Sequence, residues 1–552
     1  MPILNPDVLA EPVSRQLELS HPLSAAQLGI WFAQQLDRAS PLYNIADYLE
    51  IHGPIDRDLF ERALRQVVAE AEALHARFVD SGSGPQQFFS FSGHWPFWSL
   101  DVSAETDPRT AAETWMQVDL VRPANLMHGP LFVFALFRIA PDHFLFYRRF
   151  HHIILDGFGA SLIELRLADV YSALAAGRTP SASPFGSLRE LAAAEILYRD
   201  SDAFFRDRRH WIERIGDTPD PTSLAGRRVP AAGILRRRAH LQPETGAALR
   251  ELARTTGATL PQLLIALVSI YLHRMTGQTE LIVGLPVTAR GTRSLRCVPG
   301  MVSNVVPLRL SFARQASLDV LLQQVVREIR QSLRHQQYRY ETLRGDLNLL
   351  AGPRLLFATS INIEPFNRDL RFAGHAVTPH NLANGPAEEL DIYIFDRGTA
   401  SPLEIGFDAN AALYSDDELA AHLDRLVQLM SALAGNPGQQ IRSIEVLSGA
   451  ERLQILEAWN ATARGVPEAT LPELFEAQVA QSPQATALVF EDSSLSYGEL
   501  NVRADAVAHH LIGLGVGPES IVGLALPRSL EMVVGLLGIL KSGAAYLPLD
   551  PG

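Results

Sequence analysis

The 552-residue chain contains a single cysteine, Cys297, and a single lysine, Lys541. One cysteine excludes an intramolecular disulfide framework and argues against a thiolate zinc cluster. No apolar run of about 18 residues is free of charge, which argues against a membrane span, and the N-terminus lacks the pattern of a signal peptide. Acidic residues outnumber basic ones by 61 to 48, which argues against nucleic acid or an anionic membrane as partner. We therefore expect a cytoplasmic protein.

The composition is that of a chain that buries large cores, with 47% hydrophobic and 20% charged residues. At roughly 100–200 residues per domain, the length predicts two to four globular units. The sequence shows no internal repeat and no low-complexity tract. The chain is therefore expected to fold as several ordinary domains.

Strand and helix patterns alternate from the first residues of the expected fold. Residues 24–36 space their apolar side chains for a helix. Two apolar, aromatic runs, LFVFALFRIA and HFLFYRRF, are joined by a Pro-Asp turn and predict a β-hairpin. The second run leads into HHIILDGFG and then into a helix that Gly177 ends. A strand, a loop and a helix are thus expected around the His-His…Asp-Gly cluster.

Later composition shifts mark the expected boundaries. A Pro/Gly/Arg-rich connector over residues 217–230 follows a polar helical stretch, and mixed α/β character then continues to a long helix that begins at Asp416. The last residues restart a βα pattern. We divide the chain into a tail (1–19), a first lobe (20–185), a second lobe (186–441), a linker (442–467) and a C-terminal fragment (468–552).

The string from His151 to Gly157 carries the clearest chemistry. An imidazole titrates near neutrality, so it can transfer a proton or hold an amine by a hydrogen bond. Gly157 lets the backbone approach a ligand at the start of a helix, where a developing negative charge is favoured. Three alternatives are open. The histidines can be ordinary loop residues beside a helix-capping Asp156. The string can also belong to a metal site, although no third ligand lies at suitable spacing, or to a hydrolase triad, although no G-x-S-x-G elbow is present.

Further motifs accompany the HHxxxDG string in order: SAAQLGIWFAQ, AEALHARF, PGMVSNVVPLRL and HQQYRYETL. After the linker sequence VLSGAERLQILEAWNAT, LSYGEL and LKSGAAYLPLDP match two adenylation-domain motifs. The chain therefore resembles a condensation domain of a nonribosomal peptide synthetase, followed by the truncated start of an adenylation domain. ASPFGSL, YRDSDAFF and LANGPAEELDIYIFD resemble most the type found in the serine module of enterobactin synthetase.

The resemblance implies an α/β (α+β) fold in which two chloramphenicol-acetyltransferase-like lobes form a V-shaped pseudo-dimer, followed by a partial adenylation fragment. It also implies an amide-forming acyltransferase. The amine of an acceptor aminoacyl thioester attacks the carbonyl of a donor acyl thioester, and the donor thiol leaves. Both substrates arrive on phosphopantetheine arms of carrier proteins, and the resemblance implies neither an intrinsically bound cofactor nor a metal.

Family roles are carried over position by position. His152 is implied to be the catalytic histidine, which deprotonates or positions the amine, with Gly157 beside it. The resemblance implies that His151 and Asp156 are structural and that Asp156 pairs with Arg290. The alternative for Arg290 is an exposed surface arginine.

Two asparagines match polar tunnel positions of the second lobe. Asn304 and Asn362 are each either a substrate contact or a core amide that satisfies the backbone. The chain departs from the family pattern at Gly29, where an arginine is common, and at Glu70-Ala71-Glu72, where an Arg-His-Glu start is usual. These departures bear on the subtype rather than on activity.

Two motifs that the chain lacks determine which activities and partners we expect. The chain holds neither a phosphate loop nor a G-G-x-S carrier motif, so we expect no ATP binding, no amino-acid selection and no phosphopantetheine attachment. Only 23 residues precede Ser24, fewer than the ~80 of a carrier domain, so we expect an upstream donor carrier protein in trans and a downstream acceptor carrier outside this chain. The alternatives are an acyltransferase of the same fold that uses acyl-coenzyme A or a free amine, and a catalytically silent docking platform.

Overall fold

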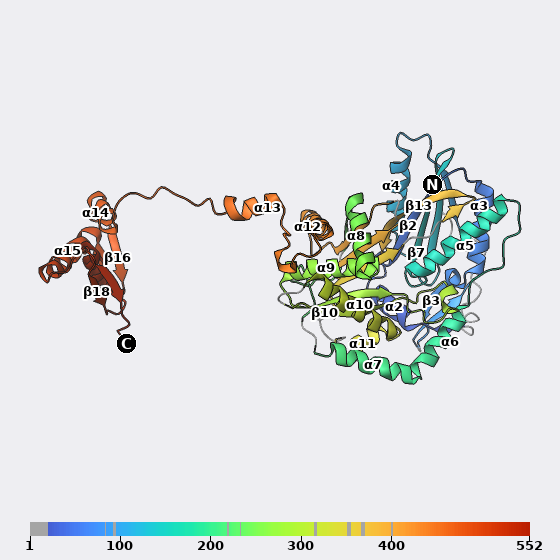
Figure 1. Ribbon diagram of the computed structural model, residues 1–552, viewed down its shortest axis with the longest axis horizontal. Helices are drawn as coiled ribbons and strands as arrows, with labels where there is room; N and C mark the ends of the chain where they lie inside the picture. Colours follow the sequence, from blue (N-terminus) through green and yellow to red (C-terminus); the bar gives the residue numbers. More distant parts are fainter. Residues whose placement is uncertain are drawn as a thin grey trace. The chain divides into compact units, whose positions relative to one another are not determined.

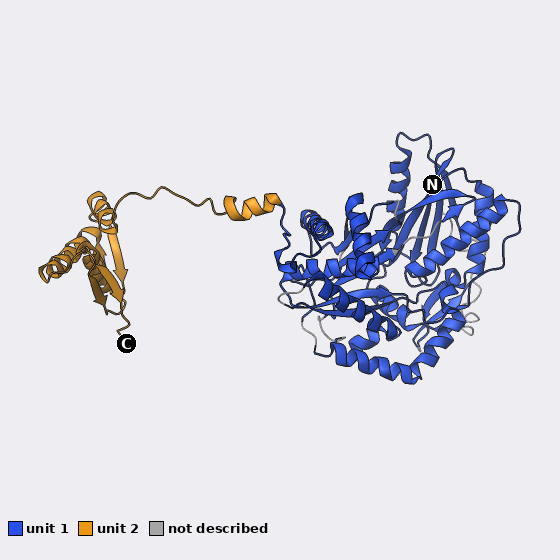
Figure 2. Ribbon diagram, in the orientation of Figure 1, with its two compact units in different colours: residues 1–448 blue, residues 449–552 orange. Residues whose placement is uncertain are grey.

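The computed structural model describes residues 20–551 apart from short gaps at 83, 92–94, 218–219, 232, 314–316, 350–354, 366–369 and 399–400. The chain divides into two compact units, Met1–Ser448 and Gly449–Gly552 (Figure 2). Within the described residues, no single helix is long and apolar enough to cross a membrane, although one sharply bent pair, Pro243–Thr256 with Leu260–Thr276, meets the test by length and composition.

The first sheet of unit 1 has six strands in the order β12-β13-β2-β7-β6-β5 (Figure 1). Its strands are β2 (Asn44–His52), β5 (Phe97–Asp101), β6 (Phe132–Ala140), β7 (His143–His151), β12 (Arg371–Phe372) and β13 (His375–Asn384). β6 and β7 pair antiparallel, which confirms the hairpin predicted from the two aromatic runs.

Helices cover both faces of this sheet because its strands are apolar on both sides. α3 (Arg57–Glu70) and α5 (Gly157–Ala175) pack on one face, where Phe60 meets Phe146 edge to face with ring centroids 4.8 Å apart. α4 (Pro108–Leu120) covers part of the other face. The turn that carries residues 151–157, which we call the catalytic-motif turn, thus joins β7 to α5. Both elements are held by a buried core.

Two strands of the first sheet come from late in the chain. β13 pairs antiparallel with β2, from Ala376 opposite His52 to Asn384 opposite Ile45. The expected division at residue 186 therefore does not hold for residues 371–384. The physical reason is that the edge of β2 offers unpaired backbone donors and acceptors, and β13 satisfies them although it is remote in sequence.

The second sheet of unit 1 also has six strands, in the order β10-β9-β11-β14-β15-β8 (Figure 1). Its strands are β8 (Ile234–His240), β9 (Glu280–Val287), β10 (Asn304–Ser311), β11 (Thr359–Pro365), β14 (Leu390–Asp396) and β15 (Glu404–Asn410). Its apolar side chains form one large core with four helices: α8 (Pro243–Thr256), α9 (Leu260–Thr276), α10 (Leu318–Arg334) and α12 (Asp416–Gly435). α9 is buried almost all round, as its near-continuous apolar sequence predicts.

Smaller elements connect the two sheets. β1 (His21–Pro22), β4 (Pro85–Phe89) and β3 (Ala76–Asp80) form a three-stranded sheet, beside the short helix η1 (Glu72–His75). α2 (Ala25–Leu36) is capped by the preceding Ser24, whose side chain accepts a hydrogen bond from the backbone N–H of Gln27. The polar helical stretch is two helices, α6 (Leu188–Arg199) and α7 (Asp202–Ile215), followed later by η2 (Leu295–Cys297), α11 (Tyr340–Asp346) and η3 (Ile441–Ser443).

Unit 2 opens inside the expected linker with α13 (Gly449–Leu453) and the π-helical turn η4 (Gln454–Ala458). It continues with α14 (Leu471–Gln481), β16 (Thr486–Phe490), β17 (Ser493–Ser496), α15 (Tyr497–Gly513), β18 (Ile521–Leu524), α16 (Leu530–Lys541) and β19 (Ala545–Pro548). β18 precedes α16 in the chain and β19 follows it, and the two strands pair in parallel, which is the βα pattern expected from the sequence. The small core of unit 2 centres on Leu495, Leu500 and Leu530.

Candidate active site

The His-His…Asp-Gly string forms the turn between β7 and α5, as expected. β7 ends at His151, and Asp156 caps α5 by accepting a hydrogen bond from the Gly159 backbone N–H at 2.7 Å. Gly157 is the first helical residue and is exposed, and nothing lies within 4 Å of the position a Cβ would take. The helix start at Gly157 therefore borders space that a ligand can enter, at the end of the helix where negative charge is favoured.

His152 is half-buried and is held in one orientation. Its backbone N–H donates to the Tyr43 carbonyl at 2.8 Å, and its Nδ1 lies 2.9 Å from the Leu155 carbonyl oxygen. Because a carbonyl only accepts, Nδ1 carries the hydrogen in the neutral ring and Nε2 is left as an acceptor. His152 can thus accept a hydrogen bond or a proton from an amine.

Gly385, in the loop after β13, lies directly against this histidine. Its φ is +101°, and a Cβ added there would lie 3.3 Å from Cδ2 of His152. Glycine alone combines that backbone conformation with so close an approach. Our sequence reasoning missed this residue, although the Asn-Gly-Pro run that contains it is a signal for a special backbone conformation.

His151 is buried and plays a structural part. Its Nε2 lies 3.0 Å from Gln34 Oε1, and its Nδ1 accepts from the Ile153 backbone N–H at 3.2 Å. Burial, together with the charges of neighbouring His152 and Arg149, lowers the pKa of His151 to about 3, so the ring is neutral. Gln34 belongs to α2, so the SAAQLGIWFAQ motif supports the catalytic-motif turn.

The ion pair expected between Asp156 and Arg290 is present. Arg290 Nη1 and Nη2 donate to the two carboxylate oxygens at 2.9 and 3.1 Å. Both side chains are buried, so the alternative of an exposed arginine is wrong. Burial alone would raise the pKa of Asp156, but the Arg290 charge and the hydrogen bonds to the carboxylate outweigh it and lower the pKa below its usual value.

Asn304 proves to be a core amide. Its Nδ2 donates to the carbonyls of Gln336 and Tyr338 at 2.9 and 2.8 Å, and its Oδ1 accepts from the Tyr340 backbone N–H at 3.1 Å. Both donor hydrogens are therefore used on the backbone of the HQQYRYETL motif. This arrangement favours the structural alternative over a substrate contact.

Asn362 lies half-buried on β11 among acidic groups that our sequence reasoning did not single out. Its Nδ2 donates to Glu364 at 2.9 Å, and Ser360 donates to Asp391 of the neighbouring β14 at 2.5 Å. Burial raises the pKa of Glu364 and of Asp391 to about 7 in each case. For Asp391, the available signal was a carboxylate inside the otherwise apolar strand LDIYIFD.

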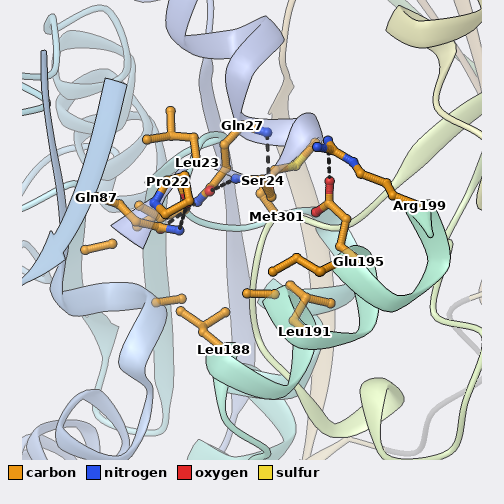
Figure 3. A pocket seen from close by; sticks show the side chains of 15 residues that line it. Pro22, Leu23, Ser24, Gln27, Gln87, Leu188, Leu191, Glu195, Arg199 and Met301 are labelled. Atoms are coloured by element: carbon orange, nitrogen blue, oxygen red, sulfur yellow. Dashed lines mark hydrogen bonds and ion pairs between the residues drawn. The ribbon is translucent and has the colours of Figure 1, made fainter. Parts of the chain in front are cut away.

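A cavity of about 130 Å³ borders the same turn at Ile154 (Figure 3). Its walls come from the start of α2, from α6 and from Met301. On one wall Glu195 accepts from the Ala25 backbone N–H at 3.1 Å and from Arg199 at 3.0 Å. α6 is thereby tied to α2, which carries Gln34, the hydrogen-bond partner of His151.

Residues 18–456 match the family model of condensation domains, and residues 475–552 match that of AMP-binding enzymes. The chain belongs to the condensation-domain family. It thus holds a condensation domain, the amide-forming acyltransferase domain of this family, followed by the start of an AMP-binding domain.

Curated relatives are much longer than this chain. It is 43% identical over 536 residues to a dimodular nonribosomal peptide synthase of Bacillus subtilis (strain 168), which covers 97% of this chain and 22% of that protein. It is 31% identical over 538 residues to enterobactin synthase component F of Escherichia coli (strain K12), which covers 96% and 41%. The chain therefore spans less than half the length of these relatives, and the expected likeness to enterobactin synthetase is confirmed.

Solved condensation domains share the fold of unit 1. A mutant starter condensation domain of rhizomide synthetase in complex with C8-CoA matches with a TM-score of 0.74 and 40% identity, over 79% of this chain and 99% of that one. The first condensation domain of the calcium-dependent antibiotic synthetase matches with a TM-score of 0.73 and 32% identity, over 78% and 99%.

Proposed function

We propose that this condensation domain joins a donor acyl thioester to the amine of an acceptor aminoacyl thioester, with both substrates on phosphopantetheine arms of carrier proteins in the cytoplasm. The acceptor nitrogen attacks the donor carbonyl carbon, the C–S bond breaks, and the amide forms. The proton lost by the amine passes to the departing thiolate. The donor carrier belongs to a separate upstream protein and the acceptor carrier to a downstream domain.

His152 is the residue we assign to the amine. The observation that carries this assignment is the hydrogen bond from Nδ1 to the Leu155 carbonyl, which leaves Nε2 as the acceptor. Among the described residues no hydrogen-bond partner is recorded for that Nε2. The ring can therefore take the amine proton, or orient the nitrogen lone pair toward the carbonyl. The first role is worth roughly 10²–10⁴-fold in rate, and the second can contribute as much or more.

Gly157 complements His152 in this proposal. Its exposed backbone lies at the start of a 19-residue helix, where the peptide dipoles favour negative charge. Charge develops on the donor carbonyl oxygen as the amine attacks it. The backbone N–H of Gly157 is therefore assigned to stabilise that oxygen, whereas the Gly159 N–H already donates to Asp156, and Asp156 and Arg290 fix the turn.

The test is amide formation from separately purified carriers, each loaded with its substrate, with the product measured by mass spectrometry. His152→Ala should lower the rate by about 100-fold or more. Replacing the exposed His128 by alanine is the matched control and should leave the rate unchanged. A His152→Ala protein that melts normally and forms product at nearly the wild-type rate would overturn the assignment.

A second candidate function differs from the first only in the donor substrate. The 40% identical rhizomide synthetase domain was solved with C8-CoA, which favours a soluble acyl-coenzyme A as donor. Offering the same acyl group on a carrier and on coenzyme A separates the two possibilities. Our proposal predicts efficient use of at least one carrier-bound donor, whereas failure of every carrier together with efficient use of the coenzyme A thioester would favour the second candidate.

A further inference from the structure

Glu50, His52 and His143 form a cluster on the first sheet, far along β7 from the catalytic-motif turn. His52 of β2 lies directly opposite His143 of β7 in the antiparallel register. Glu50 precedes His52 by two residues, so both side chains project from the same face of the sheet. His143 begins β7, whereas the motif follows the other end of that strand.

The three side chains converge closely. One potential ligand atom from each residue lies within 4.8 Å of those of the other two. Nε2 of His143 is 2.7 Å from Oε1 of Glu50, and the His52 and His143 ring centroids are 5.1 Å apart. His52 is exposed and His143 is half-buried, so an ion can reach them from solvent.

We propose that Glu50, His52 and His143 bind one divalent transition-metal ion of the zinc type. Two imidazoles and one carboxylate are a ligand set that zinc accepts, with a fourth position left to water. The distances between ligand atoms require only small side-chain shifts to meet metal–ligand bonds of about 2.0–2.2 Å. His143 and His380 hold the Glu50 carboxylate in place. The exposed His52, whose Nε2 lies 3.0 Å from the Thr378 hydroxyl, can turn toward the ion.

His380 supplies the outer contact that such sites use. It lies on β13, its Nε2 is 2.7 Å from the second carboxylate oxygen of Glu50, and its ring stacks on Tyr48 with centroids 4.5 Å apart. Partners of this kind orient a ligating carboxylate and tune metal affinity. His380 would therefore position Glu50 without binding the ion.

Arg109 competes with the ion for the same carboxylate. Its guanidinium is paired with Glu50, but it also lies 3.9 Å from Glu113 and 3.4 Å from the Tyr48 hydroxyl. The side chain is 38% exposed. Arg109 can thus turn to Glu113, one helical turn further along α4, when a cation takes its place.

The proposed site would connect strands from distant parts of the chain. Glu50 and His52 lie on β2, His143 on β7, and His380 reaches in from β13, which crosses over from the second half. A bound ion would therefore raise the stability of unit 1 through mass action, without touching His152. Metal binding and condensation are accordingly separable, and failure of one assignment leaves the other intact.

The test is titration of the tag-free, metal-depleted full chain with Zn²⁺, followed by calorimetry and thermal melting. One ion should bind per chain, and Zn²⁺ should raise the melting temperature. His143→Ala and His52→Ala should each abolish this binding, and His380→Ala should weaken it by roughly 10–100-fold. Arg109→Gln should tighten binding by about ten-fold or more, because a like charge near the ion is removed.

Two results would overturn the proposal. One is the absence of Zn²⁺ binding to the wild-type chain at millimolar concentration. The other is unchanged one-site binding in the double variant His52→Ala/His143→Ala, because the ion then lies elsewhere. His128→Ala, an exposed histidine outside the cluster, is the matched control and should bind as the wild type does. Melting curves recorded without metal show whether each variant is folded.

Discussion

Arg290 donates two hydrogen bonds to the carboxylate of Asp156, of 2.9 and 3.1 Å. The Arg290 side chain is 0% exposed and that of Asp156 is 2% exposed. The same carboxylate accepts from the backbone N–H groups of Val302 and Ser303 at 3.0 and 2.8 Å. Asp156 comes from the first half of the chain, and Arg290, Val302 and Ser303 come from the second. The shape of the catalytic-motif turn therefore depends on residues far away in sequence.

Breaking this pair should destabilise unit 1. Asp156→Ala and Arg290→Ala each leave one buried charge unpaired, which costs roughly 3–5 kcal/mol. The double variant should lose less than the sum of the two, since neither charge then remains. Denaturant unfolding of the four proteins measures this coupling, and strictly additive losses would contradict it.

An exposed ion pair provides the comparison. Arg138 and Asp101 lie 3.0 Å apart, with 43% and 52% of their side chains exposed. Water already solvates both charges, so removing either should change the unfolding curve far less than removing Asp156 or Arg290. A loss of similar size at the exposed pair would show that the method, rather than burial, sets the result.

The sequence predicts local features of this site better than distant ones. The strand, turn and helix around His152 follow from hydrophobic periodicity and a capping aspartate, which act over a few residues. The position of Gly385 does not, because β13 reaches β2 through edge hydrogen bonds that leave no periodic signal. The pair of Asp156 with Arg290 came from family resemblance, since no spacing rule connects residues so far apart.

The choice between roles for Asn304 required the structure for a similar reason. An asparagine at that position can bond a substrate or the backbone, and only the placement of the HQQYRYETL motif shows that the backbone takes its hydrogen bonds. The cluster of Glu50, His52 and His143 was invisible for another reason. It depends on the register of two strands, which single-sequence patterns specify poorly.

His151 should make the stability of unit 1 depend on pH. Its pKa is about 3 when folded and about 6.5 when unfolded, so the unfolded chain alone binds a proton as the pH falls below 6.5. Stability from the neutral ring is therefore complete above pH 6.5 and is lost progressively as the pH falls toward 3. The slope is about 1.4 kcal/mol per pH unit within that window.

His151→Gln isolates this contribution, because an amide can still donate to Gln34 but does not titrate. Urea unfolding between pH 7.5 and pH 5 should show a difference between wild type and variant that shrinks as the pH falls. Other histidines affect both proteins equally and cancel in the comparison. A difference that stays constant over this range would contradict the neutral, buried assignment of His151.

Gly385→Ala should impair catalysis more than folding. The added Cβ would lie 3.3 Å from Cδ2 of His152, so the ring or the loop must shift by a few tenths of an ångström. A small misplacement of a catalytic group can cost up to about 100-fold in rate.

The backbone strain of alanine at a φ of +101° is a separate effect. Gly374→Ala controls for it, because Gly374 has a φ of +88° and nothing lies within 4 Å of the position its Cβ would take. We expect both variants to melt at similar, slightly lowered temperatures, with condensation slowed in Gly385→Ala only. Equal rates in the two variants would show that contact with Gly385 does not position His152.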